Sequence, residues 1–319
     1  MTTLFPYDWL LAAQARIAPH IRITPLKHDH QRNLWLKWEN QQITGSFKLR
    51  GALNKVLWLE EWERQAGLVT ASAGNHGQGL AYAAKLSGAP VKVFASDHAV
   101  PRKIEAMRAL GADVELVPGG YELAEATAIR YAAEHGQTYV SAYNDAGVIA
   151  GQGTVALEIL AENPETANMT WYVPVSGGGL LSGVGLALKQ ANPSARLVGV
   201  QAAASAFMHS LLTRDTQEDV PDLPSLADGL TGPVEAGSIT IPLVRQVADE
   251  IVLIEEDFIA KAVAFAWKNY GQTIEGSGAV ALAAALDGSN GPGAVVILSG
   301  GNIQPEIHAE ILQKMEAVL

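Results

Sequence analysis

The sequence predicts an α/β protein of two domains, each built on a twisted, mostly parallel sheet covered by helices on both faces. Short runs rich in β-branched residues alternate with longer segments of helical periodicity along nearly the whole chain, as in sheets with crossover helices. Hydrophobic residues make up 48% of the 319 residues and charged residues only 17%, so most helices must be largely buried. The chain is also longer than one hydrophobic core usually serves.

Eight short apolar runs predict strands, because they favour β structure and turn residues bound them. In chain order they cover residues 34–38, 68–72, 91–96, 113–117, 170–175, 196–201, 250–254 and 294–300. Segments of helical length separate most of them, at residues 75–87, 102–110, 121–135 and 257–270. Strands joined through helices pair in parallel, so these segments predict parallel sheets.

The predicted domains share the chain by crossing over, because no linker rich in Pro, Gly or Ser divides it into halves. Residues 68–140 hold four predicted strand-helix units and could close a smaller sheet. We therefore expect a small domain at 68–145, inserted into a large domain made of 1–60 and 146–319. Residues 213–238 predict a long irregular loop, which often covers a functional site or an interface.

Composition excludes several classes of function. The formal net charge is -11 and no Lys/Arg-rich run occurs, so we expect a small-molecule ligand rather than nucleic acid or a membrane surface. Cysteine is absent, which excludes disulfides and thiolate chemistry. No signal-peptide pattern and no apolar run of about 18 residues is found, so we expect a cytoplasmic protein. Scarce surface charge predicts a homo-oligomer, a dimer or a tetramer.

The stretch TGSFKLRGA, residues 44–52, places Lys48 between Phe47 and Leu49, directly after a turn signal. A solvated lysine at a helix start is one interpretation, because perturbed amines are rare. An amine among apolar neighbours loses its proton more readily and becomes nucleophilic. A reactive Lys48 is therefore the other interpretation, and the rest of the chain must decide between them.

A glycine-rich loop, SGGGLLSG at residues 176–183, follows a predicted strand and opens a helix. Consecutive glycine N–H groups at a helix start suit a phosphate. A nicotinamide oxidoreductase is disfavoured, because Ser182 replaces the third glycine of the dinucleotide fingerprint and the next strand ends in Gln201 rather than an acidic residue. The loop also lacks the Lys-Ser/Thr pair of a P-loop.

Two further loops follow predicted strands. ASAGNHGQG, residues 71–79, brings Asn75 and His76 to a helix start, which suits a carboxylate or an ordinary helix cap. SGGN, residues 299–302, offers Ser299 to a ligand ring or as a capping serine. A reactive lysine, a phosphate cradle and a carboxylate cradle are together what a Schiff-base enzyme for amino acids requires.

Six motifs follow one another along nearly the whole chain: SFKLRGA, SAGNHGQG, VIAGQGT, VSGGGLLSG, EGSGA and LSGGN. In this order they closely resemble the threonine dehydratase and serine racemase family of pyridoxal-phosphate (PLP) enzymes, of the tryptophan synthase β-like fold type II. The resemblance implies that pyridoxal 5'-phosphate binds in the cleft between the domains. Lys48 would hold it covalently and Phe47 would lie beside its ring.

The resemblance also implies the remaining site residues. Asn75 would bond the 3'-oxygen of the cofactor, and Ser299 would face its pyridine nitrogen. The phosphate loop would consist of Ser176, Gly177, Gly178, Gly179 and Leu180. The substrate carboxylate would lie against Ser72, Ala73, Gly74, Asn75 and His76, largely on their backbone N–H groups. The roles of Glu275, Tyr143 and Asp228 stay open.

The implied reaction removes water and ammonia from a 3-hydroxy amino acid, converting L-threonine to 2-oxobutanoate and L-serine to pyruvate. Lys48 would remove the α-proton. Racemases of the family carry a second proton-transferring group, a serine, where this chain has Ala73, and a methyl group cannot carry a proton. The lyase is therefore preferred over serine racemase, which is kept as an alternative together with 3-hydroxyaspartate dehydratase and a non-catalytic PLP-binding protein.

We expect no metal site. Metal-dependent relatives place carboxylates where this chain has Gln201 and Phe207, so a hard divalent ion would lack ligands. His28 and His30 have a ligand-like spacing, but a polar loop before a strand is the simpler interpretation. Because the chain ends soon after SGGN, we also expect no C-terminal regulatory domain.

Overall fold

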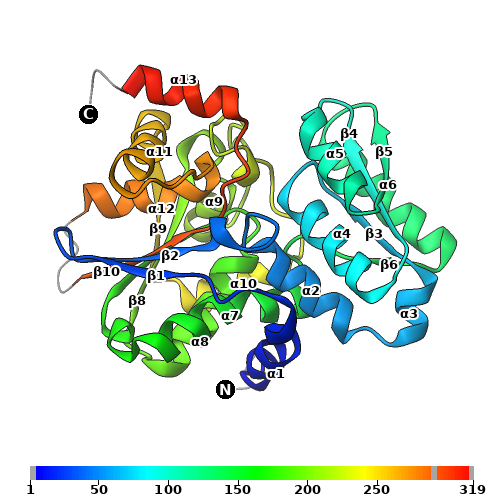
Figure 1. Ribbon diagram of the computed structural model, residues 1–319, viewed down its shortest axis with the longest axis horizontal. Helices are drawn as coiled ribbons and strands as arrows, with labels where there is room; N and C mark the ends of the chain where they lie inside the picture. The colour runs from blue at the N-terminus through cyan, green and yellow to red at the C-terminus, as the bar shows by residue number, and fades with distance from the viewer. Residues whose placement is uncertain (1–4, 289–292, 316–319) are drawn as a thin grey trace.

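The computed structural model describes residues 5–288 and 293–315. Within these residues the strands form two sheets, one with the order β1-β2-β10-β7-β8-β9 and one with the order β5-β4-β3-β6 (Figure 1). Every neighbouring pair is parallel except β1 and β2. The predicted fold class, α/β with mostly parallel sheets flanked by helices, is confirmed.

The six-stranded sheet consists of β1 (Leu26–Asp29), β2 (Leu34–Trp38), β7 (Thr170–Pro174), β8 (Arg196–Ala202), β9 (Glu250–Ile254) and β10 (Ala294–Leu298). The four-stranded sheet consists of β3 (Leu68–Ala71), β4 (Val91–Ser96), β5 (Asp113–Val117) and β6 (Thr138–Tyr139). All eight predicted strands are present, with ends that differ by at most two residues. Two strands were not predicted: β1, in which three of the four residues (LKHD) are polar, and β6, which is too short to show periodicity.

The described helices are α1 (Asp8–Ile17), α2 (Lys48–Trp58), α3 (Glu61–Ala66), α4 (Asn75–Ser87), α5 (Pro101–Ala109), α6 (Tyr121–His135), α7 (Ala146–Glu162), α8 (Gly179–Ala191), α9 (Phe207–Arg214), α10 (Thr240–Val247), α11 (Glu256–Tyr270), α12 (Gly276–Asp287) and α13 (Pro305–Met315). The predicted helices correspond to α4, α5, α6 and α11, within one residue at each end. The predicted loop at 213–238 begins inside α9 and contains one short 3-10 turn, η5 (Asp228–Leu230).

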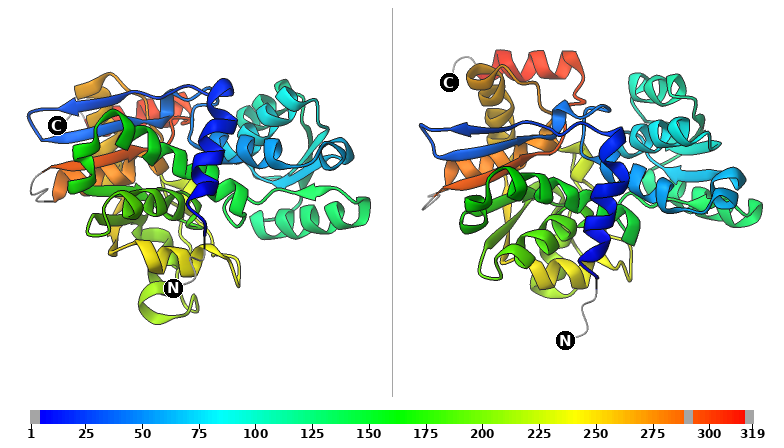
Figure 2. Two further views of the ribbon diagram at one scale, coloured as in Figure 1. Left: turned by 90° about the horizontal axis from the view of Figure 1, so that it is seen from below. Right: turned by 60° about the horizontal axis from the view of Figure 1, so that its bottom comes forward.

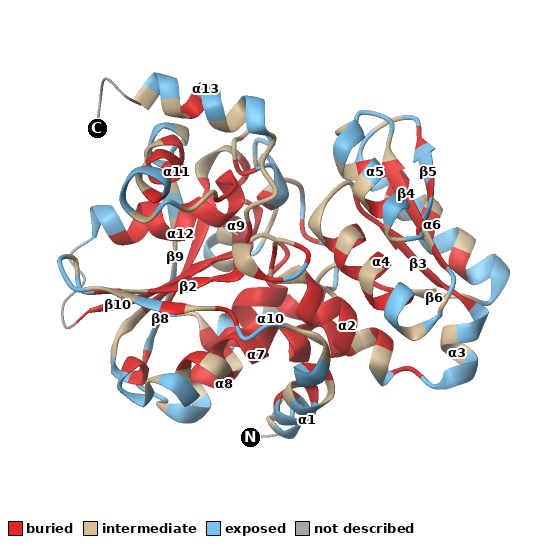
Figure 3. Cartoon of the chain, viewed as in Figure 1, coloured by how far each residue is buried: buried red, intermediate tan, exposed pale blue. Residues whose placement is uncertain are grey.

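The six-stranded sheet has a core on each face. Successive side chains of β10 point into the two cores in turn. Val295 and Ile297 pack with residues of α7 and α8. Val296 and Leu298 pack with residues of α11 and α12. This alternation is the period of a strand buried on both faces. Figure 3 shows the buried strands at the centre and exposed positions on the outer helices.

The four-stranded sheet is covered by α6 on one face and by α2, α4 and α5 on the other. Figure 2 shows the two sheets side by side, with α1 and α2 at their junction. Helix α2 also crosses α7 closely, since a Cβ on Gly151 would lie 2.5 Å from the carbonyl oxygen of Arg50. In the part of the chain that the structure describes, no helix combines the length and apolar character needed to cross a membrane.

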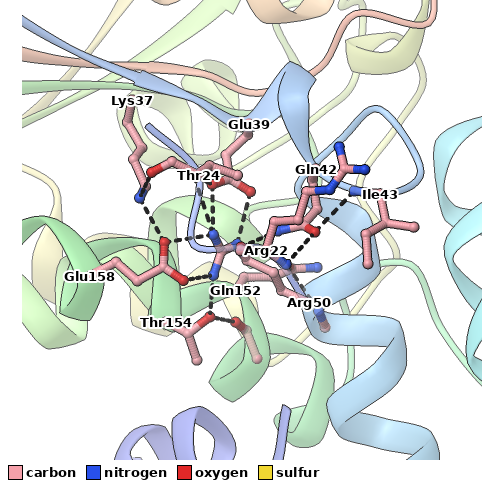
Figure 4. A network of polar contacts seen from close by, with 12 residues as sticks. Arg22, Thr24, Lys37, Glu39, Gln42, Ile43, Arg50, Gln152, Thr154 and Glu158 are labelled. Atoms are coloured by element: carbon pink, nitrogen blue, oxygen red, sulfur yellow. Dashed lines mark hydrogen bonds and ion pairs between the residues drawn. The ribbon is translucent and has the colours of Figure 1, made fainter. Parts of the chain in front are cut away.

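A buried ion network holds α2 against the large sheet (Figure 4). The guanidinium of Arg50 donates to Glu39 at 2.8 Å and to Glu158 at 2.6 Å, and Lys37 donates to Glu158 at 2.6 Å. Burial would lower the pKa of Arg50, but the two carboxylates raise it above its ordinary value. Because Arg50 lies two residues after Lys48, this network fixes the start of α2.

Candidate active site

The loops predicted to carry the chemistry lie at the carboxyl ends of β3, β7 and β10, where open α/β sheets bind their ligands. Contacts join loops from the two sheets. The side-chain amide of Asn75, at the first position of α4, donates to Glu275 Oε1 at 2.6 Å. Asn302 Nδ2 in turn donates to Asn75 Oδ1 at 2.7 Å. The structure thus brings the second and third loops together around one asparagine.

Lys48 occupies the first position of α2, after Phe47. Its amine donates to the carbonyl oxygen of Ala142 at 3.1 Å and lies 5.2 Å from the centre of the Phe47 ring. Burial lowers the pKa of Lys48 to about 8, although the nearby charge of Glu275 works in the opposite direction. The expectation of an amine in an apolar setting is therefore met, and it is Glu275 that keeps the pKa from falling further.

Backbone pairing places Lys48 beside the end of β10. Phe47 donates its N–H to the carbonyl oxygen of Ser299 at 3.0 Å, and Ser46 forms a β-bridge with Gly300. The buried Ser299 hydroxyl makes one weak hydrogen bond, 3.4 Å to the carbonyl oxygen of Ser277. A hydroxyl so weakly engaged can bond a ligand atom without first breaking a strong contact.

The glycine-rich loop is packed against Tyr143. A Cβ on Gly177 would lie 2.4 Å from the Tyr143 ring, and Gly178 has φ +86°, which favours glycine. Because Tyr143 follows Ala142 in the chain, one short segment contacts both the Lys48 amine and this loop. Burial raises the pKa of Tyr143 to about 12, and its hydroxyl accepts the Glu235 N–H at 2.9 Å. Tyr143, whose role the sequence left open, is a packing partner of the loop.

The loop before α4 is organised by Ser72, whose hydroxyl accepts the N–H groups of Gly74 at 3.2 Å and Gly77 at 2.9 Å. Ser72 therefore acts as a cap, while Ala73, Gly74 and Asn75 stay partly exposed. The first N–H groups of a helix have no partner inside it. They are available to an anion at this position.

His76 lies behind the loop and is buried. Its Nε2 lies 3.1 Å from the carbonyl oxygen of Val140, so Nε2 carries the hydrogen. Burial, together with the charge of Lys48, lowers the pKa of His76 to about 3. The side chain is therefore neutral at physiological pH, and its buried Nδ1 has no hydrogen-bond partner in the described chain.

Glu275 is the acidic member of the cluster and is only 5% exposed. Burial raises its pKa to about 7, with a further contribution from Asp228, while Lys103 and Asn75 lower it. Lys103 Nζ and Asp228 Oδ2 form an ion pair of 2.8 Å. No role was predicted for Lys103, which no local pattern marks, or for Asn302, which lies in the SGGN motif, because their partners Asp228 and Asn75 are distant in the chain.

The candidate metal positions do not form a metal centre. Gln201 accepts the N–H of His209 at 3.0 Å, and Phe207 packs in the core. His28 stacks on Trp35, and a surface cavity beside it contains none of the predicted site residues. Across residues 5–288 and 293–315, no group of three or more His, Asp or Glu side chains could hold a metal ion.

A family model described as "Pyridoxal-phosphate dependent enzyme" matches residues 13–300 of this chain. The chain belongs to this family. The resemblance found in the sequence is thereby confirmed, and so is the cofactor, pyridoxal phosphate.

Characterised relatives are similar over most of their length. An L-threonine ammonia-lyase of Thermotoga maritima is 41% identical over 88% of this chain and 70% of the relative. One of Geobacter sulfurreducens is 37% identical over 98% of this chain and 79% of the relative. Among solved structures, maize serine racemase has a TM-score of 0.90 and 32% identity, covering 99% of both chains.

The residues present fit the cofactor of this PLP enzyme. Lys48 offers an amine of lowered pKa, as covalent attachment to an aldehyde requires. The loop at Gly177–Gly179 leaves no room for side chains and opens α8, so its N–H groups can face a phosphate. The Ser299 hydroxyl and the second hydrogen of Asn75 Nδ2 remain for polar atoms of the ring.

Proposed function

We propose that this PLP enzyme is an ammonia-lyase that converts L-threonine to 2-oxobutanoate and L-serine to pyruvate, releasing ammonia. The observation that carries the proposal is the environment of Lys48, an amine of lowered pKa hydrogen-bonded to Ala142, whose neighbour Tyr143 packs on the glycine-rich loop, in a site that also holds the partly exposed start of α4. The activity of the relatives from Thermotoga maritima and Geobacter sulfurreducens supports it.

The cofactor supplies an electron-withdrawing group that makes the α-hydrogen of a bound amino acid acidic. Lys48 takes that proton: with a pKa of about 8, a useful fraction of its amine is neutral near physiological pH. The carbonyl oxygen of Ala142, 3.1 Å away, orients the amine. Loss of the β-hydroxyl as water and hydrolysis of the resulting enamine then give the 2-oxo acid and ammonia.

In this proposal two sets of residues hold the cofactor and one holds the substrate. The cofactor phosphate binds the N–H groups of Ser176, Gly177, Gly178, Gly179 and Leu180. Around the ring, Phe47 packs on one side, Asn75 bonds the 3'-oxygen and Ser299 faces the pyridine nitrogen. The substrate carboxylate binds the loop of Ser72, Ala73, Gly74, Asn75 and His76, where Ser72 shapes the turn and the later N–H groups receive the anion.

The test is the formation of 2-oxo acid and ammonia from a panel of 3-hydroxy amino acids that includes L-threonine, L-serine and 3-hydroxyaspartate. The wild-type enzyme should turn over threonine or serine. Lys48→Ala should abolish turnover, while Lys85→Ala, which changes an exposed lysine of α4, should not. Turnover of 3-hydroxyaspartate alone would assign the enzyme to that dehydratase class, and ammonia release by none would favour a non-catalytic PLP-binding protein.

Serine racemase is a second candidate, because the fold matches maize serine racemase at a TM-score of 0.90. Ala73 argues against it, since this partly exposed position of the loop carries only a methyl group and racemisation needs a proton donor on the second face. Chiral chromatography of L-serine reactions decides between them. D-Serine formed as fast as pyruvate would make racemisation the main activity.

We further propose two domains, the large one at 1–60 and 146–319 and the small one at 68–145, of which residues 1–4, 289–292 and 316–319 lie outside the described chain. The two separate sheets support this division. We also propose a cytoplasmic homo-oligomer, a dimer or a tetramer. Exposed apolar side chains on α1 and α3, among them Leu11 and Trp62, support self-association. Light scattering after size exclusion tests it.

A further inference from the structure

Lys103 and Asp228 form an ion pair between elements of the two sheets. Lys103 lies on α5, which packs on the small sheet, and Asp228 lies in η5, 125 residues later in the chain. Lys103 Nζ donates to Asp228 Oδ2 at 2.8 Å. The Lys103 side chain is 17% exposed and that of Asp228 59% exposed, so the lysine is the sheltered partner and the aspartate faces solvent.

The Lys103 amine lies next to the loop that carries the exposed helix N–H groups. A Cβ built on Gly74 would be 3.9 Å from Lys103 Nζ and 3.8 Å from its Cδ. Gly74 is the residue before Asn75 and occupies the N-cap position of α4. The positive charge of the Lys103 amine therefore adds to the partial positive charge of the helix N-terminus. An anion bound at the start of α4 would be attracted by both.

Two acidic groups surround the same place. Asp228 and Lys103 both act on the charge state of Glu275, in opposite directions, which shows that all three groups lie close together. Asp228 is held on the large sheet, because Gly229 donates its N–H to Ser277 Oγ at 2.9 Å at the start of α12. Lys103 is therefore the cation that offsets Asp228 and Glu275 where a carboxylate would enter.

We propose that Lys103 is a substrate-binding residue that recognises the carboxylate of the amino acid, and that Asp228 holds this lysine until the substrate carboxylate replaces it. The proposal deepens the proposed function, on which it rests for the class of ligand. Breaking an ion pair costs little free energy when the aspartate is mostly exposed to water. A carboxylate bound to helix N–H groups gains a charge-assisted hydrogen bond from the lysine.

The test uses propanoate, which has a carboxylate but neither the amine nor the hydroxyl of threonine, so its binding does not depend on turnover. Isothermal titration calorimetry of the holoenzyme at low ionic strength gives its Kd. Lys103→Met should raise this Kd about tenfold and Lys103→Arg should largely restore it, as expected for a charged hydrogen bond. Asp228→Asn should lower the Kd, because it frees the lysine.

A matched control is Lys92→Met. The Lys92 side chain is also 17% exposed and also forms an ion pair, with Asp113 at 2.7 Å. Lys92 lies in β4 and Asp113 in β5, so this pair joins two strands of the small sheet instead of the two sheets. This variant should leave the Kd of propanoate unchanged. In steady-state assays, Lys103→Met should raise the KM for the amino acid while kcat changes little, since the lysine acts on binding rather than on proton transfer.

The two variants are expected to change the Kd of propanoate in opposite directions. This distinguishes carboxylate binding by Lys103 from a purely structural role in holding the two sheets together. If the ion pair only held the sheets together, Lys103→Met and Asp228→Asn would change the Kd in the same direction, and that result would overturn the proposal, as would an unchanged Kd in Lys103→Met. If propanoate binding depends on Lys103 but no 3-hydroxy amino acid is turned over, the carboxylate site stands and the ammonia-lyase proposal fails.

Discussion

Asn75 and Glu275 are joined by a hydrogen bond of 2.6 Å although 200 residues separate them in the chain. Asn75 opens α4 on the small sheet, and Glu275 precedes α12 on the large one. Asn302 fixes the other end of the Asn75 amide at 2.7 Å, so its orientation is set by both partners. One hydrogen of Nδ2 then remains for the cofactor.

Glu275→Gln should move the pH dependence of the reaction. The negative charge of Glu275 raises the pKa of Lys48, so its removal should lower that pKa further, by about one unit for a nearby buried charge. The acid limb of kcat against pH, which reports the enzyme–substrate complex in which the Lys48 amine is free, should shift to lower pH in the variant. The exposed Glu310→Gln on α13 serves as control. An acid limb that stays in place would show that Glu275 does not act on Lys48.

In the wild-type enzyme the rate should rise as the pH passes through about 8. Lys48 must be neutral to take a proton, and burial lowers its pKa from 10.5 to about 8. Its neutral fraction therefore grows on the alkaline side of about 8, where an unperturbed lysine would still be charged. Pre-steady-state measurement of α-proton loss from deuterated substrate follows this step. If the rate of α-proton loss rose only near the ordinary lysine pKa, the claim that burial lowers the pKa of Lys48 would be contradicted.

Gly177→Ala should weaken cofactor binding. The added Cβ would lie 2.4 Å from the Tyr143 ring, so the loop or the tyrosine must move, at a cost of about 1–3 kcal/mol. PLP titration followed by tryptophan fluorescence should give a Kd about tenfold higher or more. Gly120→Ala is the matched control, because nothing lies within 4 Å of a Cβ there. Equal PLP affinity in both variants would argue against a tight phosphate cradle.

Arg50→Met should destabilise the fold by about 3–5 kcal/mol, because Glu39 and Glu158 would lose a buried partner. Urea unfolding measures this. Arg196→Met, which breaks an exposed ion pair with Glu250, should cost less than about 1 kcal/mol. Similar losses in the two variants would contradict the role given to the buried network.

The same network should make stability depend on pH. Burial would raise the pKa of Glu39, but the charge and hydrogen bonds of Arg50 outweigh it and lower that pKa below 4.5. A lowered folded-state pKa contributes stability above the unfolded value, and this contribution is lost as the pH falls through the folded value. The free energy of unfolding should therefore fall on acidification below about 4.5, and less so in Arg50→Met.

The sequence predicted the class of fold correctly, and it marked the candidate site residues, because both signals are local. A run with β-branched residues followed by glycines marks the end of β7, which the structure places at Pro174, and α4 and α6 have the predicted ends. The loop before α4 was predicted as either a cap or a carboxylate site; the structure shows Ser72 accepting two N–H groups of the loop, and the carboxylate site stays a prediction.

What the sequence could not predict depends on contacts between distant segments. Asn302 lies 227 residues from Asn75, and Lys103 lies 125 residues from Asp228. No periodicity links such pairs, so neither Asn302 nor Lys103 could be assigned a role before the two sheets were placed together. The network around Arg50 was missed for the same reason, since an arginine in a helix pattern gives no sign that it is fully buried.

The central claim is that Lys48 carries the cofactor and the chemistry. Reduction of the holoenzyme with borohydride, followed by peptide mass spectrometry, locates the lysine that is covalently bound to PLP. The account predicts a phosphopyridoxyl adduct on the peptide that contains Lys48 and on no other. An adduct on a different lysine, or an unmodified Lys48 in an enzyme that is saturated with PLP and active, would contradict it.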